Sequence, residues 1–108
     1  MLSDPTLEEV IQEIRDFHAV PERIEIDANT ELERQLGITG DDMYDLFSRF
    51  EDKYLFSFTS PEGDWWTAFG ISEGFYLFNG EFSSDPEKVF PLTAGQLHLA
   101  ILRRLHRA

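Results

Sequence analysis

The sequence contains no cysteine, which excludes disulfides, thiol nucleophiles and thiolate metal ligands. It also lacks any apolar run approaching the roughly 20 residues with which a helix crosses a bilayer. The N-terminus shows no basic segment followed by an apolar one, the pattern of a secretory signal. We therefore expect a soluble, cytoplasmic protein that makes no membrane contact and folds as a single domain over residues 1–108.

Basic residues are scarce as well: nine stand against 21 acidic residues, which gives a net charge of −12. All the acidic residues lie within positions 1–87, and positions 88–108 contain only basic charges. An acidic surface repels the phosphates of nucleic acids, so we expect no DNA or RNA partner. It attracts a basic protein surface and speeds the encounter with it. Keeping a small domain in solution explains the acidity equally well.

The two ends of the chain have the pattern of amphipathic helices. Thr6 and Glu9 have the spacing of a capping box, and the apolar face that follows ends near His18. Thr93 is placed to cap a last helix. The apolar residues are Leu7, Val10, Ile11, Ile14 and Phe17 in the first segment and Leu97, Ala100, Ile101 and Leu105 in the last. Each segment therefore predicts a helix with one buried face.

Residues 41–54 have the strongest helical pattern in the chain. The apolar residues, at the spacing of one helix stripe, are Met43, Leu46, Phe47, Phe50 and Tyr54. The other side carries Asp41, Asp42, Asp45 and Asp52, with Arg49 as the basic residue among them. Thr39 is the expected cap. We predict that the apolar stripe organises the core and that the acidic side contacts a partner.

The connection after the first helix has two recognisable parts. Ile24 and Ile26 alternate with charged residues, as they do when one side of a segment lies on the core. A single short turn then starts at Thr30, has leucines at positions 32 and 36, and ends at Gly37. We expect this connection to lead directly into the central helix.

Residues 54–82 hold ten of the fifteen aromatic residues, with glycines at intervals. The segments 64–69 and 74–78 suit a short β-hairpin. A short helix near 61–69 is the alternative, because proline fits the first turn of a helix. The rings complete a small core, or else Trp65 or Trp66 is partly exposed and anchors a contact with a partner.

Motifs for catalysis are missing: the sequence has no glycine-rich phosphate loop, no zinc spacing and no nucleophile elbow. Asp41 and Asp42 are possible oxygen ligands, but carboxylates at a helix start are better explained as partners of the helix dipole. His98 and His106 are eight positions apart, too far to share a metal without other ligands. His18 suits a helix-end cation. We expect neither an enzyme nor a metal site.

The stretch from Thr30 to Tyr54 resembles the central part of an acyl carrier protein. The matching residues are Thr30, Leu32, Leu36, Gly37, Asp42, Asp45, Leu46, Phe50, Glu51, Asp52 and Tyr54. The chain is also similar to a bacterial family of carrier-protein-like domains of unknown function, with Pro91, Leu92 and Thr93 as a shared feature. The resemblance implies a mainly α fold: a carrier-like helical bundle with the aromatic-rich segment inserted before the last helix.

The sequence departs from that family at the attachment serine. Acyl carrier proteins have Asp-Ser-Leu there, and the serine hydroxyl accepts 4′-phosphopantetheine. This chain has Thr39, Gly40 and Asp41 instead, so Gly40 has no side chain to modify. Thr39 lies one residue early, and Ser48 lies in mid-helix. We predict a carrier-like fold without a prosthetic arm and without another cofactor.

Two functions fit these residues. The first is a non-catalytic carrier-like interaction module in which Asp41, Asp45 and Asp52 meet a basic groove. The second is a small acidic inhibitor or immunity protein that neutralises a basic toxin by charge and shape. The first implies transient binding, whereas the second implies a nanomolar or tighter complex, worth about 12 kcal/mol or more.

Overall fold

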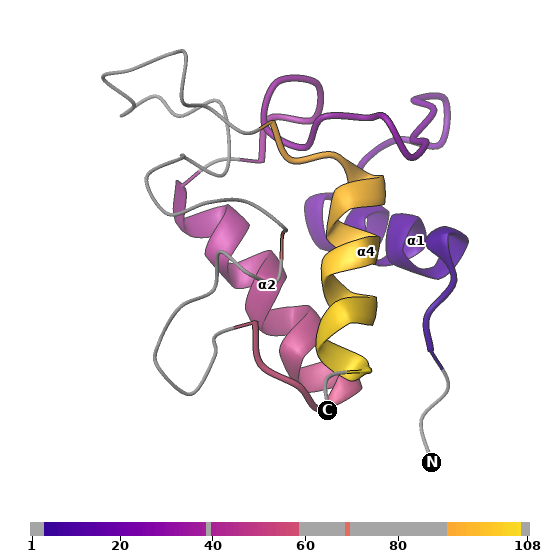
Figure 1. The fold of residues 1–108 in the computed structure, drawn as a ribbon. Coiled ribbons are helices and arrows are strands. Elements are labelled where there is room, and N and C mark those ends of the chain that lie inside the picture. The colour runs from indigo at the N-terminus through magenta and orange to yellow at the C-terminus, as the bar shows by residue number, and fades with distance from the viewer. Residues whose placement is uncertain (1–3, 39, 59–68, 70–90, 107–108) are drawn as a thin grey trace.

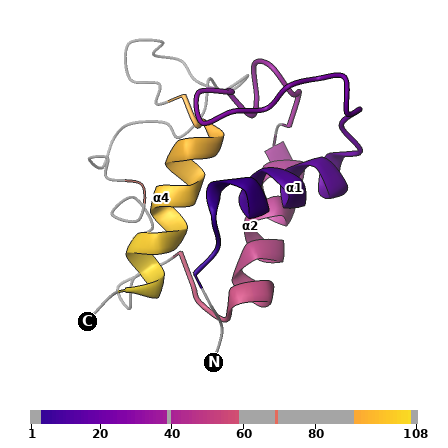
Figure 2. The same ribbon diagram turned by 90° about the vertical axis from the view of Figure 1, so that its right-hand side faces the viewer.

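The fold is that of a computed structural model, which describes residues 4–38, 40–58, 69 and 91–106. With the labels of Figure 1, its helices are α1 (Leu7–His18), α2 (Gly40–Tyr54) and α4 (Ala94–Leu105). In Figure 1 α4 runs upright, α2 runs obliquely on one side of it and α1 lies across on the other side; Figure 2 shows α1 crossing in front of α2. Within the described ranges, β-structure is limited to one isolated bridge. The predicted mainly α fold is confirmed at this level.

Local signals define the ends of the two terminal helices as predicted. The Thr6 hydroxyl accepts a hydrogen bond from the Glu9 amide, and the Glu9 carboxylate accepts one from the Thr6 amide, both at 3.1 Å. α1 ends where Ala19 takes a left-handed conformation with φ of 51°. The Thr93 hydroxyl caps α4 through the Gln96 amide at 3.1 Å. These contacts satisfy amides that a helix start leaves without a backbone partner.

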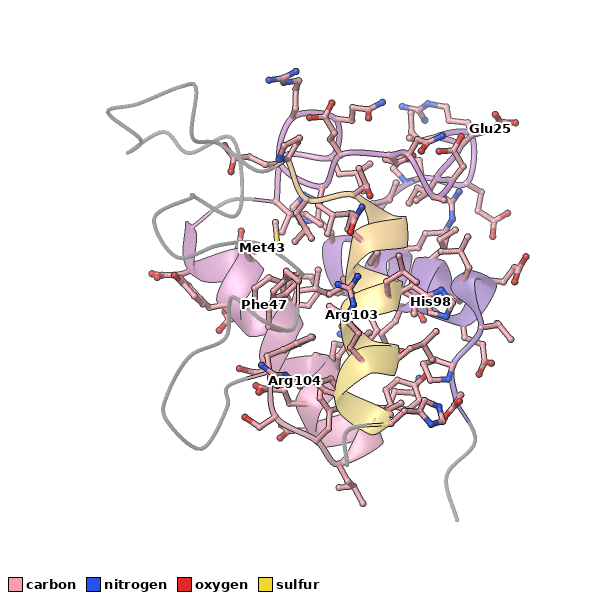
Figure 3. All side chains as sticks on the ribbon, viewed as in Figure 1. Glu25, Met43, Phe47, His98, Arg103 and Arg104 are labelled. Carbon is pink, nitrogen blue, oxygen red and sulfur yellow. The ribbon has the colours of Figure 1, made fainter. Side chains whose placement is uncertain are left out.

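The apolar stripe of α2 is the centre of the core. Met43, Leu46 and Phe50 are fully buried, and Phe47 and Tyr54 nearly so. Figure 3 shows Met43 and Phe47 pointing from α2 toward α4. Burying a side chain of this size stabilises the fold by about 1.5–3 kcal/mol relative to leaving it exposed. The prediction of a continuous helix packed through these residues is confirmed; it begins at Gly40, one residue before the predicted range.

The start of α4 is tied to the connection between α1 and α2. The Leu32 amide donates to the Leu92 carbonyl at 2.9 Å, and the Ala94 amide donates to the Thr30 carbonyl at 3.0 Å. Glu31 and Thr93 form the antiparallel bridge. The connection, which lies over one end of the helices in Figures 1 and 2, is thereby fixed to the last helix.

This pairing continues to Gly95, whose amide donates to the Ala28 carbonyl at 2.9 Å. A Cβ at residue 95 would lie 2.8 Å from that carbonyl oxygen, so only glycine allows the approach. The predicted turn after Thr30 is present and ends at Gly37, which has φ of +75°. Left-handed backbone of this kind favours glycine.

Two details of the connection differ from prediction. Ile26 is buried, but Ile24 is 40% exposed. The Arg15 guanidinium donates to the carbonyls of Pro21 and Ile24, so this part is coiled and the alternation of an extended segment does not apply. The Thr30 hydroxyl accepts from the Asp27 amide at 2.9 Å and so faces back along the chain instead of capping the turn that follows.

Several predictions fall outside the described residues. They are the Thr39 cap of α2, the hairpin or helix within 61–78, and the roles of Trp65 and Trp66. From the aromatic segment before α4, Phe69 is described and is buried against Phe47, with ring centroids 5.5 Å apart. A second ring, Phe58, stacks on Phe69 at 5.3 Å. Phe58 and Phe69 therefore belong to the core beside α2.

Candidate functional site

The exposed side of α2 carries the four predicted aspartates, and the structure divides them into two groups. Asp41, Asp45 and Asp52 fall on one line of the helix, directly opposite the buried stripe, with Ser48 between them. We call these three aspartates the acidic stripe. All three are exposed, and none has an ion-pair partner among the residues that the structure describes. Asp42, also exposed, lies around the helix toward the side of Arg49.

The two basic residues of α2 are turned away from the acidic stripe. Arg49 and Lys53 both bind the carboxylate of Glu13 on α1: the Arg49 Nε contacts Oε1, and the Lys53 Nζ lies 2.6 Å from Oε2. Glu13 itself is buried, with 7% of its surface exposed. The Arg49 guanidinium also lies over the Phe17 ring and the Lys53 amine near the Tyr54 ring, at 5.9 and 5.8 Å from their centroids.

The proximity of these charges changes how Glu13 and Lys53 titrate. Burial alone raises the pKa of Glu13, but the hydrogen bonds from Lys53 and Arg49, with their charges, outweigh it and bring that pKa below its ordinary value of 4.5. The hydrogen bond to Glu13 raises the pKa of Lys53 above 10.5. Burial raises the pKa of Tyr54 above 10.0. The charged forms of Glu13 and Lys53 therefore stabilise each other across the contact between α1 and α2.

Sequence reasoning missed Glu13, although two signals point to it. Glu13 falls between Val10 and Phe17 on the apolar face of α1, a position that places its carboxylate at the edge of the core. Arg49 and Lys53 are four residues apart on α2, the spacing that brings two side chains to one side of a helix. A carboxylate on one apolar face and paired cations on another helix predict a buried ion pair.

His98 on α4 and His106, which caps the end of α4, contact the N-terminal segment. His98 Nε2 lies 2.8 Å from the Pro5 carbonyl oxygen, to which it donates, and His106 Nε2 contacts the Asp4 carboxylate. Among the described residues, no group of three or more histidines or carboxylates is arranged to bind a metal ion. Both histidines therefore have structural contacts that fix the start of the chain against α4.

The residues compared with the attachment serine of carrier proteins are Thr39, Gly40 and Ser48. Gly40 is the first residue of α2, so the helix begins with a residue that has no side chain. Ser48, two turns further on, is exposed within the acidic stripe. Thr39 and Trp65 belong to the parts of the chain that the structure does not describe.

The C-terminal end of α2 exposes an apolar side chain. Leu55 follows the helix with φ of 58°, and 79% of its surface is exposed. The Phe56 amide donates to the Glu51 carbonyl at 3.2 Å, and the Phe58 amide donates to the Glu51 carboxylate at 2.9 Å. This reversal buries Phe58 and leaves Leu55 exposed, three residues after Asp52.

Shallow grooves lie elsewhere on the molecule. One, of about 300 Å³, is formed by the end of α1 and residues 35–36. Another, of about 330 Å³, lies at the start of α4 beside Asn29 and Leu99. Neither groove includes a residue of the acidic stripe, whose three aspartates are exposed on the side of α2 opposite the core. Such a surface suits contact with a protein better than enclosure of a small molecule.

None of the described helices is both long and apolar enough to span a bilayer. The helices that form the core are instead amphipathic, each with one buried face. Comparisons of the chain with protein-family models, with curated proteins and with solved structures give no match.

Proposed function

We propose that the protein is a non-catalytic, carrier-like interaction module that presents the acidic stripe of α2 to a basic protein surface. The segregation of charge on α2 carries this proposal. Glu13 draws Arg49 and Lys53 to the α1 side, so the cations of the helix do not neutralise its carboxylates. The three aspartates of the stripe are thus exposed together, and like charges on neighbouring turns repel one another. A basic partner relieves that repulsion.

The module works without a covalent arm. The resemblance to acyl carrier proteins includes the acidic second helix but not the serine that holds 4′-phosphopantetheine. Gly40 occupies the helix start instead and provides no nucleophile. The contact with the partner is therefore the function itself, and no acyl group is delivered through it.

The charge-reversal variant Asp45→Lys/Asp52→Lys tests the proposal. Capture of partners from the native cell extract on the immobilised protein is compared in low and in high salt, because salt screens contacts between exposed charges. The matched control is Glu22→Lys/Glu25→Lys, which changes the net charge equally on exposed residues. Figure 3 shows Glu25 on the connection after α1, far from α2.

We expect a basic protein to be captured by the wild type and by the control, and to be lost with the α2 variant. Loss through unfolding is not expected, because both positions are exposed. At Asp52, in the last turn of α2, a lysine is favoured over an aspartate by about 0.3–1 kcal/mol. Equal capture by all three proteins contradicts the proposal. A captured toxin-like enzyme held with nanomolar or tighter affinity favours the inhibitor function instead.

A further inference from the structure

Leu55 combines two features that a protein seldom keeps at one surface position. Its backbone is in the left-handed region, with φ of 58°, where a side chain with a Cβ is disfavoured and glycine or asparagine is preferred. Its side chain is 79% exposed, so the strain is not offset by burial within the chain. Glycine at this position ends a helix more favourably, and a polar side chain suits the solvent better.

The position of Leu55 is fixed and is not that of a loose loop tip. The Phe56 amide and the Phe58 amide both bind Glu51, one through its backbone carbonyl and the other through its carboxylate. Phe58 is buried among the core rings directly after this turn. The leucine side chain is consequently presented in one place, at the end of α2.

Leu55 comes directly after the last residue of α2, three residues after Asp52 of the acidic stripe. From Asp41 to Asp52 the helix rises about 16 Å, and Leu55 follows about one turn later. A partner that covers the stripe and Leu55 needs basic groups along that length and an apolar face beside them. Two copies of this chain do not meet these needs, because pairing through this surface would bring the stripes of like charge together.

We propose that Leu55 is the apolar anchor of the partner contact, and that the partner segment is a basic amphipathic helix. Its basic side chains pair with the acidic stripe, and its apolar side chains cover Leu55. Since the anchor lies at one end of the stripe only, it sets the direction in which the partner helix lies along α2. This inference rests on the proposed function of the acidic stripe and adds the apolar requirement to it.

Two synthetic helical peptides serve as probes of this surface. They carry the same number of lysines; one has leucines on its second face, and the other has serines in their place. The full-length protein is titrated with each peptide in low salt, and the ratio of the two dissociation constants measures the apolar contribution. We expect the leucine peptide to bind the wild type about tenfold tighter, which is within what burial of one leucine provides.

Leu55→Asn is expected to abolish this preference while it leaves affinity for the serine peptide within about twofold. Its melting temperature should rise, because asparagine tolerates the left-handed backbone. Ala19→Gly is the control for strain, since Ala19 has φ of 51° at the end of α1; it should keep the preference. Leu99→Gln is the control for loss of an exposed leucine, since Leu99 is 45% exposed on α4; it should also keep the preference.

The outcomes separate the two proposals. One outcome is that Asp45→Lys/Asp52→Lys weakens the binding of both peptides while Leu55→Asn leaves the tenfold preference unchanged. In that case the proposed role of Leu55 is wrong, and the proposed role of the acidic stripe is supported. If neither peptide depends on Asp45 and Asp52, the proposed function itself is wrong. A wild-type dimer in sedimentation that Leu55→Asn dissociates would overturn the inference, because a second copy would then cover Leu55.

Discussion

Glu13 is a buried, charged residue whose carboxylate needs partners of opposite charge. Its carboxylate is buried and is satisfied by Arg49 and Lys53. Replacing it with glutamine keeps the shape but removes the charge to which both cations bind. Loss of one partner of a buried pair costs most when the remaining charge is also buried, and here both cations are about half exposed. Glu13→Gln should therefore lower the free energy of unfolding by about 1–2 kcal/mol.

Urea denaturation of Glu13→Gln beside Glu8→Gln measures this effect. Glu8 is an exposed carboxylate in the first turn of the same helix, so its replacement controls for the loss of one negative charge on α1. A Glu13→Gln variant that is no less stable than the Glu8→Gln variant would show that the ion pair contributes nothing.

Gly95 is constrained by a contact with the backbone and not by its own torsion angles. Adding a Cβ would bring it within 2.8 Å of the Ala28 carbonyl oxygen, which cannot move without breaking the pairing of the two segments. Gly95→Ala should thus cost about 1–3 kcal/mol of stability and speed amide hydrogen exchange at residues 94 and 95. Gly37→Asn is the control, because its surroundings are open and asparagine tolerates positive φ; a cost within about 0.5 kcal/mol is expected there.

Residues whose partners lie within one turn were predictable, and those with distant partners were not. Thr6 and Thr93 cap helices through amides three positions away, so their spacing in the sequence determines the contact. Glu13 pairs with residues 36 and 40 positions away, and its partners depend on how α1 crosses α2. The turn after Thr30 was predicted, but not the contact of its hydroxyl, which accepts from the Asp27 amide on the other side of the residue.

The contact between the helices α1 and α2 depends on pH because it contains the ion pairs of Glu13. Glu13 has a pKa below 4.5 in the folded protein. Its stabilising contribution is therefore present above pH 4.5 and is lost as the pH falls through the lowered value. Lys53 and Tyr54 have pKa values above 10.5 and 10.0. Their contributions are present below those values and are lost as the pH rises through the raised ones.

Unfolding free energies measured from acid to alkaline pH should accordingly fall at both ends. In Glu13→Gln the acid fall should be shallower than in the wild type, because one carboxylate with a lowered pKa has been removed. In Lys53→Met the unfolding free energy should fall less steeply at alkaline pH, because, of these two groups, only Tyr54 still contributes to the fall. If the acid limb of Glu13→Gln runs parallel to that of the wild type, Glu13 is not a group whose pKa is lowered by folding.

At the scale of the helix, the period of the apolar residues was sufficient to predict α2. Five apolar residues at one helical spacing predicted which face of α2 is buried. The opposite, acidic side was therefore expected to be exposed. The same reasoning failed for Ile24, where alternation over a few residues predicted burial. There the Arg15 guanidinium binds two carbonyls of the connection, and a long-range contact of this kind leaves no periodic trace in the sequence.

The described helices form a small bundle in which the basic residues of α2 lie on a different side from the acidic stripe. This arrangement depends on α1, since Glu13 is what turns Arg49 and Lys53 away from the stripe. The acidic side of α2 was predicted from the sequence. The contact of Arg49 and Lys53 with Glu13 was not, because it joins two helices that are distant along the chain. The pairing of Ala28 with Gly95 was unpredictable for the same reason: its only sequence signal is a glycine at the second position of a helix.

The proposed lack of a prosthetic arm concerns the protein as a whole, because an arm distinguishes a carrier of acyl groups from a module that only binds. Co-expression with a phosphopantetheinyl transferase should leave the intact mass of this protein unchanged, since α2 begins at Gly40 and the exposed Ser48 lies two turns into the helix. A genuine acyl carrier protein, co-expressed in the same cells, is the control and should gain the mass of the arm. A covalent pantetheine adduct on any residue of this chain would contradict the arm-free module. An unchanged mass, together with binding of the basic peptide, is the combination that the acidic stripe predicts.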